Sequence, residues 1–265
     1  MTDIFFPVVE RDCVWIDKTG GKNSTGKKAI VACLEDKSPQ LIGLVGEDYK
    51  LLHNRDVYVA IAQVIAGNNT KVKMYCDRNL SRTFFDVTFN DIYVTLNDHR
   101  INFRAIFWNG YAGSSLGLYA GAINFFCMNG MITGVYETKW KRHTKSLDTK
   151  VIKDWLHVGI STYQKQTKNW FEYGMREITF NTALNLFERF DEKRTDDMSE
   201  LYRTKYTPTY GPTLWSALNC MTDVATHFDK YKKRKVTSST EHSSAFSRLI
   251  QAEKVVGDYY TSLAA

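Results

Sequence analysis

The stretch from Phe85 to Phe107, FDVTFNDIYVTLNDHRINFRAIF, decides the fold. Apolar residues stand at every second position in it, which is typical of strands that bury one face. The dipeptide Asn90-Asp91 interrupts the first alternating run and predicts a hairpin turn. A third run continues the same period from Ile101 to Phe107. The stretch therefore predicts consecutive antiparallel strands at the centre of the protein.

The segments before this stretch predict one helix and one more strand. From Asn54 to Ala66, apolar residues recur at helical spacing, and Gly67-Asn68-Asn69 ends the run. Residues 71–76 then alternate between apolar and polar side chains, as expected of a strand of the same sheet. The first forty residues predict short strands separated by turn-forming segments.

The chain changes character at about Lys150, where the apolar period becomes helical. The first helix predicted in this second half has Ile152, Leu156 and Tyr163 on one face. Lys150, Lys153 and other polar residues lie on its opposite face. Three more helices are predicted at 181–192, 214–232 and 245–263, separated by a loop at 205–212 and a polar linker at 236–244. The predicted class is α+β, with a central antiparallel sheet preceded by a helix and a C-terminal helical half.

These elements divide the chain into three segments. Residues 1–43 are a β-rich segment, residues 44–136 are the helix and antiparallel sheet, and residues 137–265 are a helical region packed on that sheet. A chain of 265 residues is long enough for one large domain or two small ones, and one compact domain is the expectation.

Composition limits the class of protein. Hydrophobic residues make up 43% and charged residues 24% of the chain, and the formal net charge of +6 is compatible with a polyanionic partner. Five scattered cysteines without a C-x-x-C pair argue for a reducing compartment and against a zinc site. No apolar run approaches the roughly 20 residues that span a bilayer, and the acids in MTDIFFPVVERD are atypical of a signal peptide. We expect a cytoplasmic protein without a membrane partner.

Candidate catalytic motifs are weak. Gly21–Lys27 matches G-x-x-x-x-G-K, but Lys28 follows where a phosphate-binding loop needs Ser or Thr, and a strand pattern comes next. A hairpin loop that exposes lysines is the better interpretation. The acids at 86, 91, 196 and 197 fit turns and a solvated loop, and Cys127 has no nearby activating partner. No catalytic residue, cofactor or metal site is predicted, and an enzyme is the least favoured hypothesis.

Basic and aromatic side chains alternate in and around one segment, KWKRHTK at 139–145. Single-stranded nucleic acids are held in this way, because cations follow the phosphates while aromatic rings stack on bases. The alternative is a solvated surface and a tryptophan in the core. The predicted nucleic-acid-binding residues are Arg78, Arg82, Arg104, Trp108, Lys139, Trp140, Lys141, Arg142, Lys145, Lys150 and Lys153.

Three sequence features together resemble one family. A Gly-Ser turn at 113–115 precedes Cys127-Met128-Asn129-Gly130, the segment 211–219 reads GPTLWSALN with Thr213 as a helix cap, and a Tyr-Lys pair at 49–50 precedes the first helix. This pattern, over about Leu44 to Tyr260, is similar to a phage- and plasmid-encoded family known as domain of unknown function nine-three-two. Cys220 stands where that family commonly has Ala. The family offers no catalytic residues to carry over.

The order of helix and antiparallel strands is also similar to single-strand annealing recombinases of the Red-beta type, which form rings and hold single-stranded DNA in a basic groove. These resemblances imply a phage-type, homo-oligomeric protein of the host-cell cytoplasm. It would bind single-stranded DNA and assist recombination, annealing or replication. The alternative is a phage interaction protein that binds a host protein without catalysis.

Overall fold

A computed structural model describes residues 4–35, 37–77, 79–124, 129–132, 138–227 and 241–263. Its centre is a six-stranded antiparallel sheet, in which neighbouring strands follow the chain from β4 to β8 and β9 pairs with β7 beside β8. The strands are β4 (Thr70–Cys76), β5 (Arg82–Leu96), β6 (His99–Gly110), β7 (Ser115–Asn124), β8 (Asn129–Ile132) and β9 (Thr138–Arg142). The sheet and the helices confirm the predicted α+β class.

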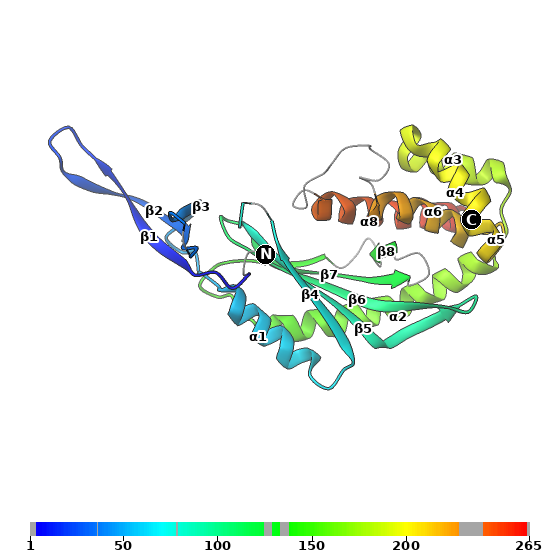
Figure 1. The fold of residues 1–265 in the computed structure, drawn as a ribbon, viewed down its shortest axis with the longest axis horizontal. Coiled ribbons are helices and arrows are strands. Elements are labelled where there is room, and N and C mark those ends of the chain that lie inside the picture. The colour runs from blue at the N-terminus through cyan, green and yellow to red at the C-terminus, as the bar shows by residue number, and fades with distance from the viewer. Residues whose placement is uncertain are drawn as a thin grey trace.

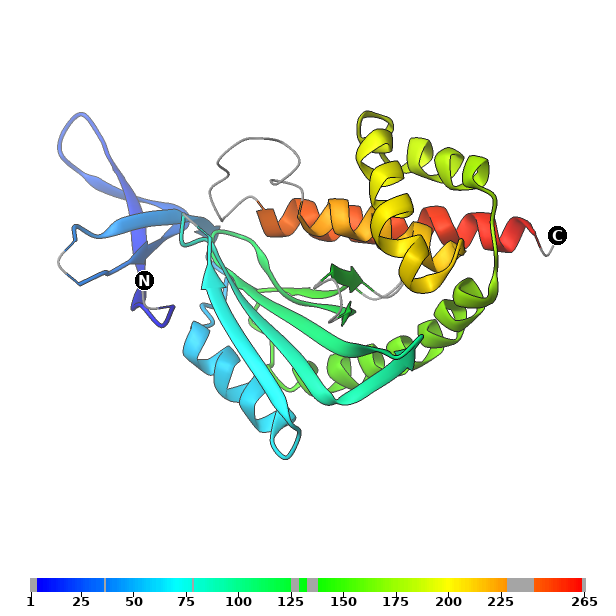
Figure 2. The same ribbon diagram turned by 45° about the vertical axis from the view of Figure 1, so that its right-hand side comes forward.

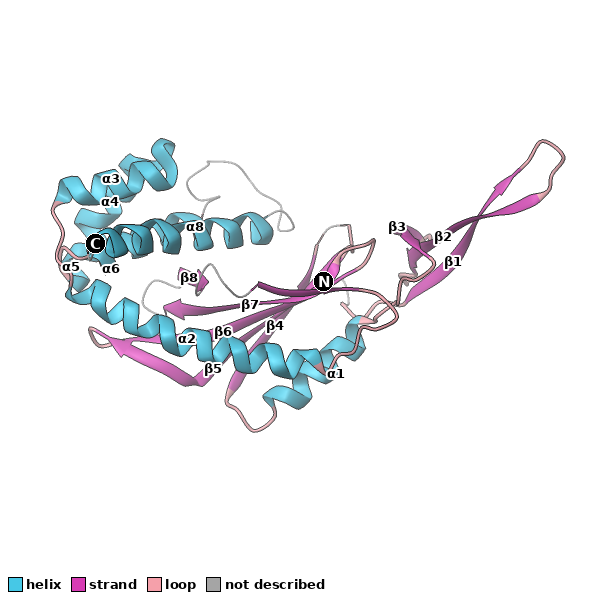
Figure 3. Ribbon diagram, turned by 180° about the vertical axis from the view of Figure 1, so that it is seen from behind, coloured by secondary structure: helices cyan, strands magenta, loops and turns pink. Residues whose placement is uncertain are grey.

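Two helices cover one face of this sheet (Figure 3). The register places Phe85 beside Phe107 and Phe107 beside Leu118, so that these side chains share a face. Helices α1 (Asn54–Ile65) and α2 (Val151–Met175) pack on that face, and all three side chains are almost fully buried there. The alternation read from the sequence therefore marks the face under the helices.

The hairpin prediction at Asn90-Asp91 was wrong. Strand β5 continues through both residues as a bulge, since four of its residues, 89–92, lie opposite Phe103 alone. Asn69 fixes the bulge, because its backbone carbonyl accepts from the Asn90 N–H and its own N–H donates to Asp91. The tight turn comes later, at Asn97-Asp98, where both residues have positive φ as a two-residue hairpin requires. The long hairpin bends at the bulge (Figure 2).

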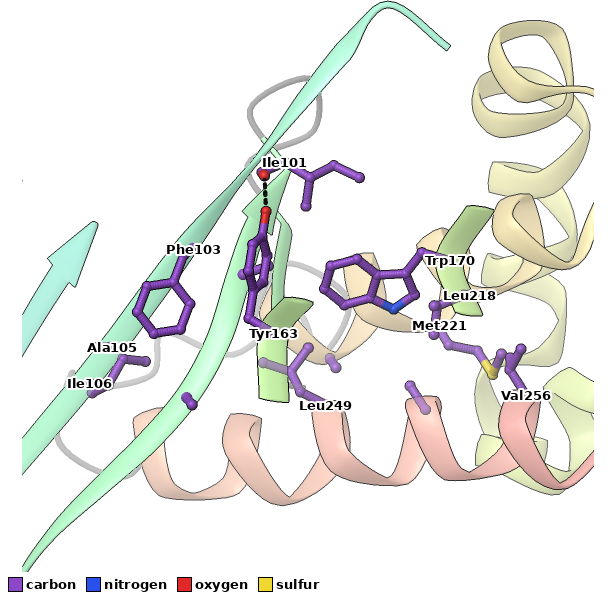
Figure 4. Packing of buried hydrophobic residues seen from close by; sticks show 14 of the residues in the cluster. Ile101, Phe103, Ala105, Ile106, Tyr163, Trp170, Leu218, Met221, Leu249 and Val256 are labelled. Atoms are coloured by element: carbon purple, nitrogen blue, oxygen red, sulfur yellow. Dashed lines mark hydrogen bonds between the residues drawn. The ribbon is translucent and has the colours of Figure 1, made fainter. Parts of the chain in front are cut away.

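Helix α2 joins the sheet to the C-terminal helices (Figure 4). The Tyr163 hydroxyl donates to the carbonyl of Ile101 on β6 at 2.6 Å, and the ring centroids of Trp170 and Trp215 are 5.9 Å apart. Trp215 belongs to α6 (Leu214–Thr226), which is buried on all sides from Leu214 to Ala225. Thr213 caps α6 as predicted, because its hydroxyl accepts from the N–H of Ser216.

The remaining helices surround α6. They are α3 (Phe180–Asp191), the short helices η1 (Glu192–Arg194) and α4 (Thr195–Leu201), the π-helical turn η2 (Tyr202–Tyr206), α5 (Thr207–Tyr210) and α8 (Glu241–Ser262). The predicted loop at 205–212 was wrong up to Tyr210, because Pro208 stands in the first turn of α5, where a proline costs no hydrogen bond. Asp196 and Asp197, expected in a solvated loop, lie in the first turn of α4.

The N-terminal strands form a second sheet with its own apolar cluster. The order is β1 (Val8–Ile16), β2 (Lys22–Ala32) and β3 (Gln40–Gly46). Phe6, Ile30 and Tyr111 are among the buried residues at its base. The β1–β2 hairpin extends away from the body, at the opposite end from the C-terminal helices (Figure 1).

Gly117 allows β7 to lie against a buried tryptophan. A Cβ atom at this position would overlap the Trp108 ring, and Trp108 is only 5% exposed, so the ring has no free space to move into. We expect Gly117→Ala to lower the free energy of unfolding by about 1–3 kcal/mol in urea denaturation. Gly46→Ala on β3 is the matched control, because nothing lies within 4 Å of its Cβ position. Equal stabilities of the two variants would contradict this reading of the contact.

Glu253 makes stability depend on pH. It lies buried between α8 and α2, where its carboxylate accepts from Trp170 Nε1 at 3.0 Å and Gln166 Nε2 at 3.1 Å. Burial raises the pKa of Glu253 to about 8, whereas an unfolded glutamate titrates near about 4.3. The folded state therefore binds the proton more tightly, and stability is expected to fall as the pH rises between these values, by up to about 1.4 kcal/mol per pH unit.

Glu253→Gln removes this ionisation while keeping an acceptor for Trp170. We expect the variant to lose less stability than the native protein when urea denaturation is compared at about pH 5 and about pH 9. Identical pH dependence in both proteins would show that Glu253 does not titrate in this range.

Candidate nucleic-acid interface

Strand β9 places the predicted basic-aromatic segment at the edge of the main sheet. Its side chains alternate, so the segment divides over two faces. Trp140 pairs with Gly117 and Arg142 with Ser115, which puts both on the face opposite α1 and α2. Lys141 pairs with Leu116 and belongs to the helix-covered face. The sequence suggested one cluster, whereas the structure presents cations on both sides of an edge strand.

Trp140 is the exposed end of an aromatic row. In register across five strands, the row consists of Tyr75, Phe84, Trp108, Gly117 and Trp140. The rings of Tyr75 and Phe84 stack with centroids 5.2 Å apart. Trp140 is 57% exposed, whereas Trp108 is buried. Trp108 is therefore a buried member of the row, and of these two predicted tryptophans only Trp140 presents its ring to a partner.

Arg82 joins this face from β5. It pairs with Gly110 in register and lies near Tyr119, whose ring centroid is 4.5 Å from that of Trp108. Burial raises the pKa of Tyr119, and the positive charge of Arg82 opposes that rise. Arg82 is half-buried, so a cation stands beside the aromatic residues on the same face as Arg142.

Arg104 is placed differently from the prediction. Its Nε and Nη2 atoms donate to the two carboxylate oxygens of Asp86 at 2.8 and 2.6 Å. The Arg104 side chain is 18% exposed and that of Asp86 is 7% exposed. The pair occupies the sheet face beside the aromatic row, and it gives Asp86 a structural partner. Because Asp86 balances its charge and its side chain is mostly buried, Arg104 offers little to a phosphate.

Lys150 and Lys153 lie at a pocket between α1 and α2. The pocket has a volume of about 410 Å³, and no Asp or Glu is among its lining residues. Its lining is Ala60, Gln63, Val64, Thr149, Lys150, Lys153 and His157. Lys150 is also 3.8 Å from Asp148, but both side chains are largely exposed, so this contact is weak. The pocket is suited to an anionic group.

The loop between β9 and α2 is fixed by contacts that the sequence did not reveal. His143 is buried, its ring stacks on Tyr49 with centroids 5.3 Å apart, and burial lowers its pKa. Lys50 Nζ donates to the Leu147 carbonyl at 2.7 Å. Lys145 Nζ lies 2.7 Å from a carboxylate oxygen of Asp48 on the surface. The segment before α1 therefore holds the basic loop in place, and the Tyr-Lys pair at 49–50 is the only signal for it in the sequence.

Some predicted residues fall outside what the structure describes. Arg78 and Cys127 are not among the described residues, and only the backbone of Lys139 is described, paired with Leu118. Within the described ranges, no group of three or more His, Cys, Asp and Glu side chains is arranged to hold a metal ion. Among the described helices, none combines the length and apolar character needed to cross a bilayer.

The ion pair of Arg104 and Asp86 should matter for stability. Removal of one partner leaves the other charge unpaired in a mostly buried site, so Arg104→Gln and Asp86→Asn are each expected to cost about 3 kcal/mol or more in urea denaturation. The double variant should cost less than the sum of the two. If Arg104→Gln keeps native stability but loses nucleic-acid affinity, this prediction is wrong and Arg104 contacts nucleic acid.

Comparison with known proteins identifies the family to which the chain belongs. A family model described as "Domain of unknown function (DUF932)" matches residues 41–249. No curated protein and no solved structure matches the chain significantly. The match begins in β3, contains the main sheet and α2, and ends within α8. Because it covers well over half of the chain, this protein belongs to the DUF932 family.

Proposed function

We propose that this protein binds single-stranded DNA along the β9 surface, which we define as Trp140, Lys141, Arg142 and Arg82, and so assists recombination, annealing or replication. One observation carries the proposal: a half-exposed tryptophan stands on β9, which among the described residues pairs only with β7, with cations on both faces of the strand. The ring of Trp140 offers a stacking platform for a base, and the cations follow the backbone.

Charge and burial support a binding role. Lys150 and Lys153, at the start of α2, add two cations at the pocket between α1 and α2. Annealing requires only that a strand be held with its bases accessible, so a surface of cations and stacking rings suffices without a reacting side chain.

The element order supports the comparison with annealing recombinases. Helix α1, the six antiparallel strands β4 to β9 and helix α2 follow one another along the chain. We extend the proposal to a phage-type protein that forms homo-oligomers in the host-cell cytoplasm. Fold alone does not establish this role, so the test addresses the β9 surface directly.

The proposal predicts specific losses of affinity. Trp140→Ala should weaken binding of a fluorescent single-stranded oligonucleotide by about 1–3 kcal/mol, since one stacked base is lost. Lys141→Gln with Arg142→Gln should weaken binding for every sequence tested and reduce the slope of log K against log salt by about 0.7 per lost phosphate contact. Fluorescence anisotropy at several salt concentrations measures both effects.

The chain offers matched controls. Phe171 is an exposed aromatic residue on α2, and Lys165 and Lys168 are exposed lysines on the same helix. Phe171→Ala and the pair Lys165→Gln and Lys168→Gln should leave affinity within about twofold, since about 0.4 kcal/mol separates affinities that differ by that factor. If the control variants and the β9 variants lose the same affinity, the interaction is non-specific charge attraction and not binding at the β9 surface.

A second candidate function is an interaction protein that binds a host protein. It is favoured by Phe171 and Met175, which stand one helical turn apart on α2 and are 44% and 83% exposed. Interfaces are enriched in such aromatic and methionine side chains. The same titration separates the candidates, because absence of oligonucleotide binding at low salt favours the host-protein function.

A further inference from the structure

The β1–β2 hairpin continues beyond the three-stranded sheet as a free ribbon. Strand β3 pairs with β2 only from Lys27 to Ala32, whereas β1 and β2 stay paired as far as Ile16 and Lys22. We call residues 13–27 the arm. It begins at an irregularity in the register where Gly26 has a φ of +64°, and a glycine bulge of this kind increases the twist of a ribbon. In Figure 1 no described helix or strand lies over the end of the arm.

The arm carries a concentrated positive charge. Lys18, Lys22 and Lys27 are all exposed, and within the described part of the chain none of them forms an ion pair. The only acid in the arm is Asp17, whose carboxylate accepts from the N–H and hydroxyl of Thr19 and from the N–H of Gly21. These hydrogen bonds lower the pKa of Asp17 and hold the turn in shape. The lysines are therefore free to attract a polyanion.

The arm also exposes apolar side chains. Trp15 pairs with Asn23 on one face and Ile16 with Lys22 on the other, and Val14, Trp15 and Ile16 are all at least 49% exposed. A two-stranded ribbon is only marginally stable in water by itself. An exposed indole beside an amide can stack on a base, and Lys22 on the opposite face of the same two-stranded ribbon adds a cation for a phosphate.

The base of the arm is continuous with the β9 surface. Lys27 pairs with Gly46 at the end of β3, and the next residues contact the loop after β9. There the Asp48 carboxylate reaches Lys145, and the Tyr49 ring stacks on His143, directly after Arg142. These contacts therefore place the segment at the base of the arm next to the loop that follows β9.

We propose that the arm is a second contact for the same single strand that the β9 surface binds, with Trp15 stacking on a base and Lys18, Lys22 and Lys27 contacting phosphates. This inference rests on the proposed function and assigns it a longer binding site. The competing occupant is a second copy of this chain, seated on Val14 and Ile16. Three unpaired lysines around these residues favour a polyanion over a protein surface of mixed charge.

The length of the oligonucleotide tests the inference. A short single strand of about 10 nucleotides lies within the site size of one binding module, and a strand of roughly four times that length can reach a second contact. The arm variant combines Trp15→Ala with Lys18→Gln, Lys22→Gln and Lys27→Gln. The control variant carries Lys165→Gln, Lys168→Gln and Lys193→Gln, three exposed lysines outside both surfaces, together with Phe171→Ala.

The arm variant is expected to bind the long oligonucleotide about 10-fold or more weaker in fluorescence anisotropy, with a salt slope smaller by about 2 because three phosphate contacts are lost. Its affinity for the short oligonucleotide, which the β9 surface alone can hold, should stay within about twofold, a difference of about 0.4 kcal/mol. The control variant should bind both like the native protein, and circular dichroism should show that all variants remain folded.

Three other outcomes would contradict the role of the arm, the nature of its partner or the proposed function. Native affinity of the arm variant for the long oligonucleotide overturns the role of the arm, while losses in the β9 variants on both lengths leave the proposed function standing. If light scattering shows that the arm variant changes the oligomeric state without a change in DNA affinity, the occupant is a second copy. If the native protein binds neither oligonucleotide at low salt, both proposals fail.

Discussion

The structure depends on the burial of one face of the main sheet under α1 and α2. Phe85, Phe107 and Leu118 lie side by side on that face, and a shift of one residue would move all of them to the other side. The same constraint fixes what the opposite face displays. The aromatic row that ends in Trp140 and the cations Arg82 and Arg142 stand there because their neighbours in the sequence are needed in the core.

Most elements could be predicted from the sequence because local patterns specify them. The helix that begins at Asn54 and the Thr213 cap agree with the structure, since apolar spacing and a hydroxyl before a helix are sufficient signals. The prediction failed at Asn90-Asp91, where contacts with Asn69, far along the chain, convert a turn sequence into a bulge. It also failed near Pro208, because a proline inside the first helical turn resembles a loop signal.

The candidate site was harder to predict than the fold. The segment at 139–145 was found from its composition, but its division over two faces depends on the pairing of β9 with β7. Trp140 is exposed whereas Trp108 is buried, and Arg104 forms an ion pair with Asp86. Neither fact can be read from the sequence pattern alone. The anchoring of His143 on Tyr49 joins residues far apart in the chain, so only the folded structure shows why the basic loop lies where it does.

The edge position of β9 has a consequence for solubility. In the described part of the chain, β9 has a partner strand only on the β7 side, and an unpaired edge is a template on which another chain can add a strand. Charged side chains on such a strand discourage that addition through repulsion between like copies. Lys141 and Arg142 thus act as gatekeepers against aggregation whatever else they contact. A polyanion bound along this edge would neutralise the charges of Lys141 and Arg142. The protein would then be most prone to self-association while the polyanion is bound.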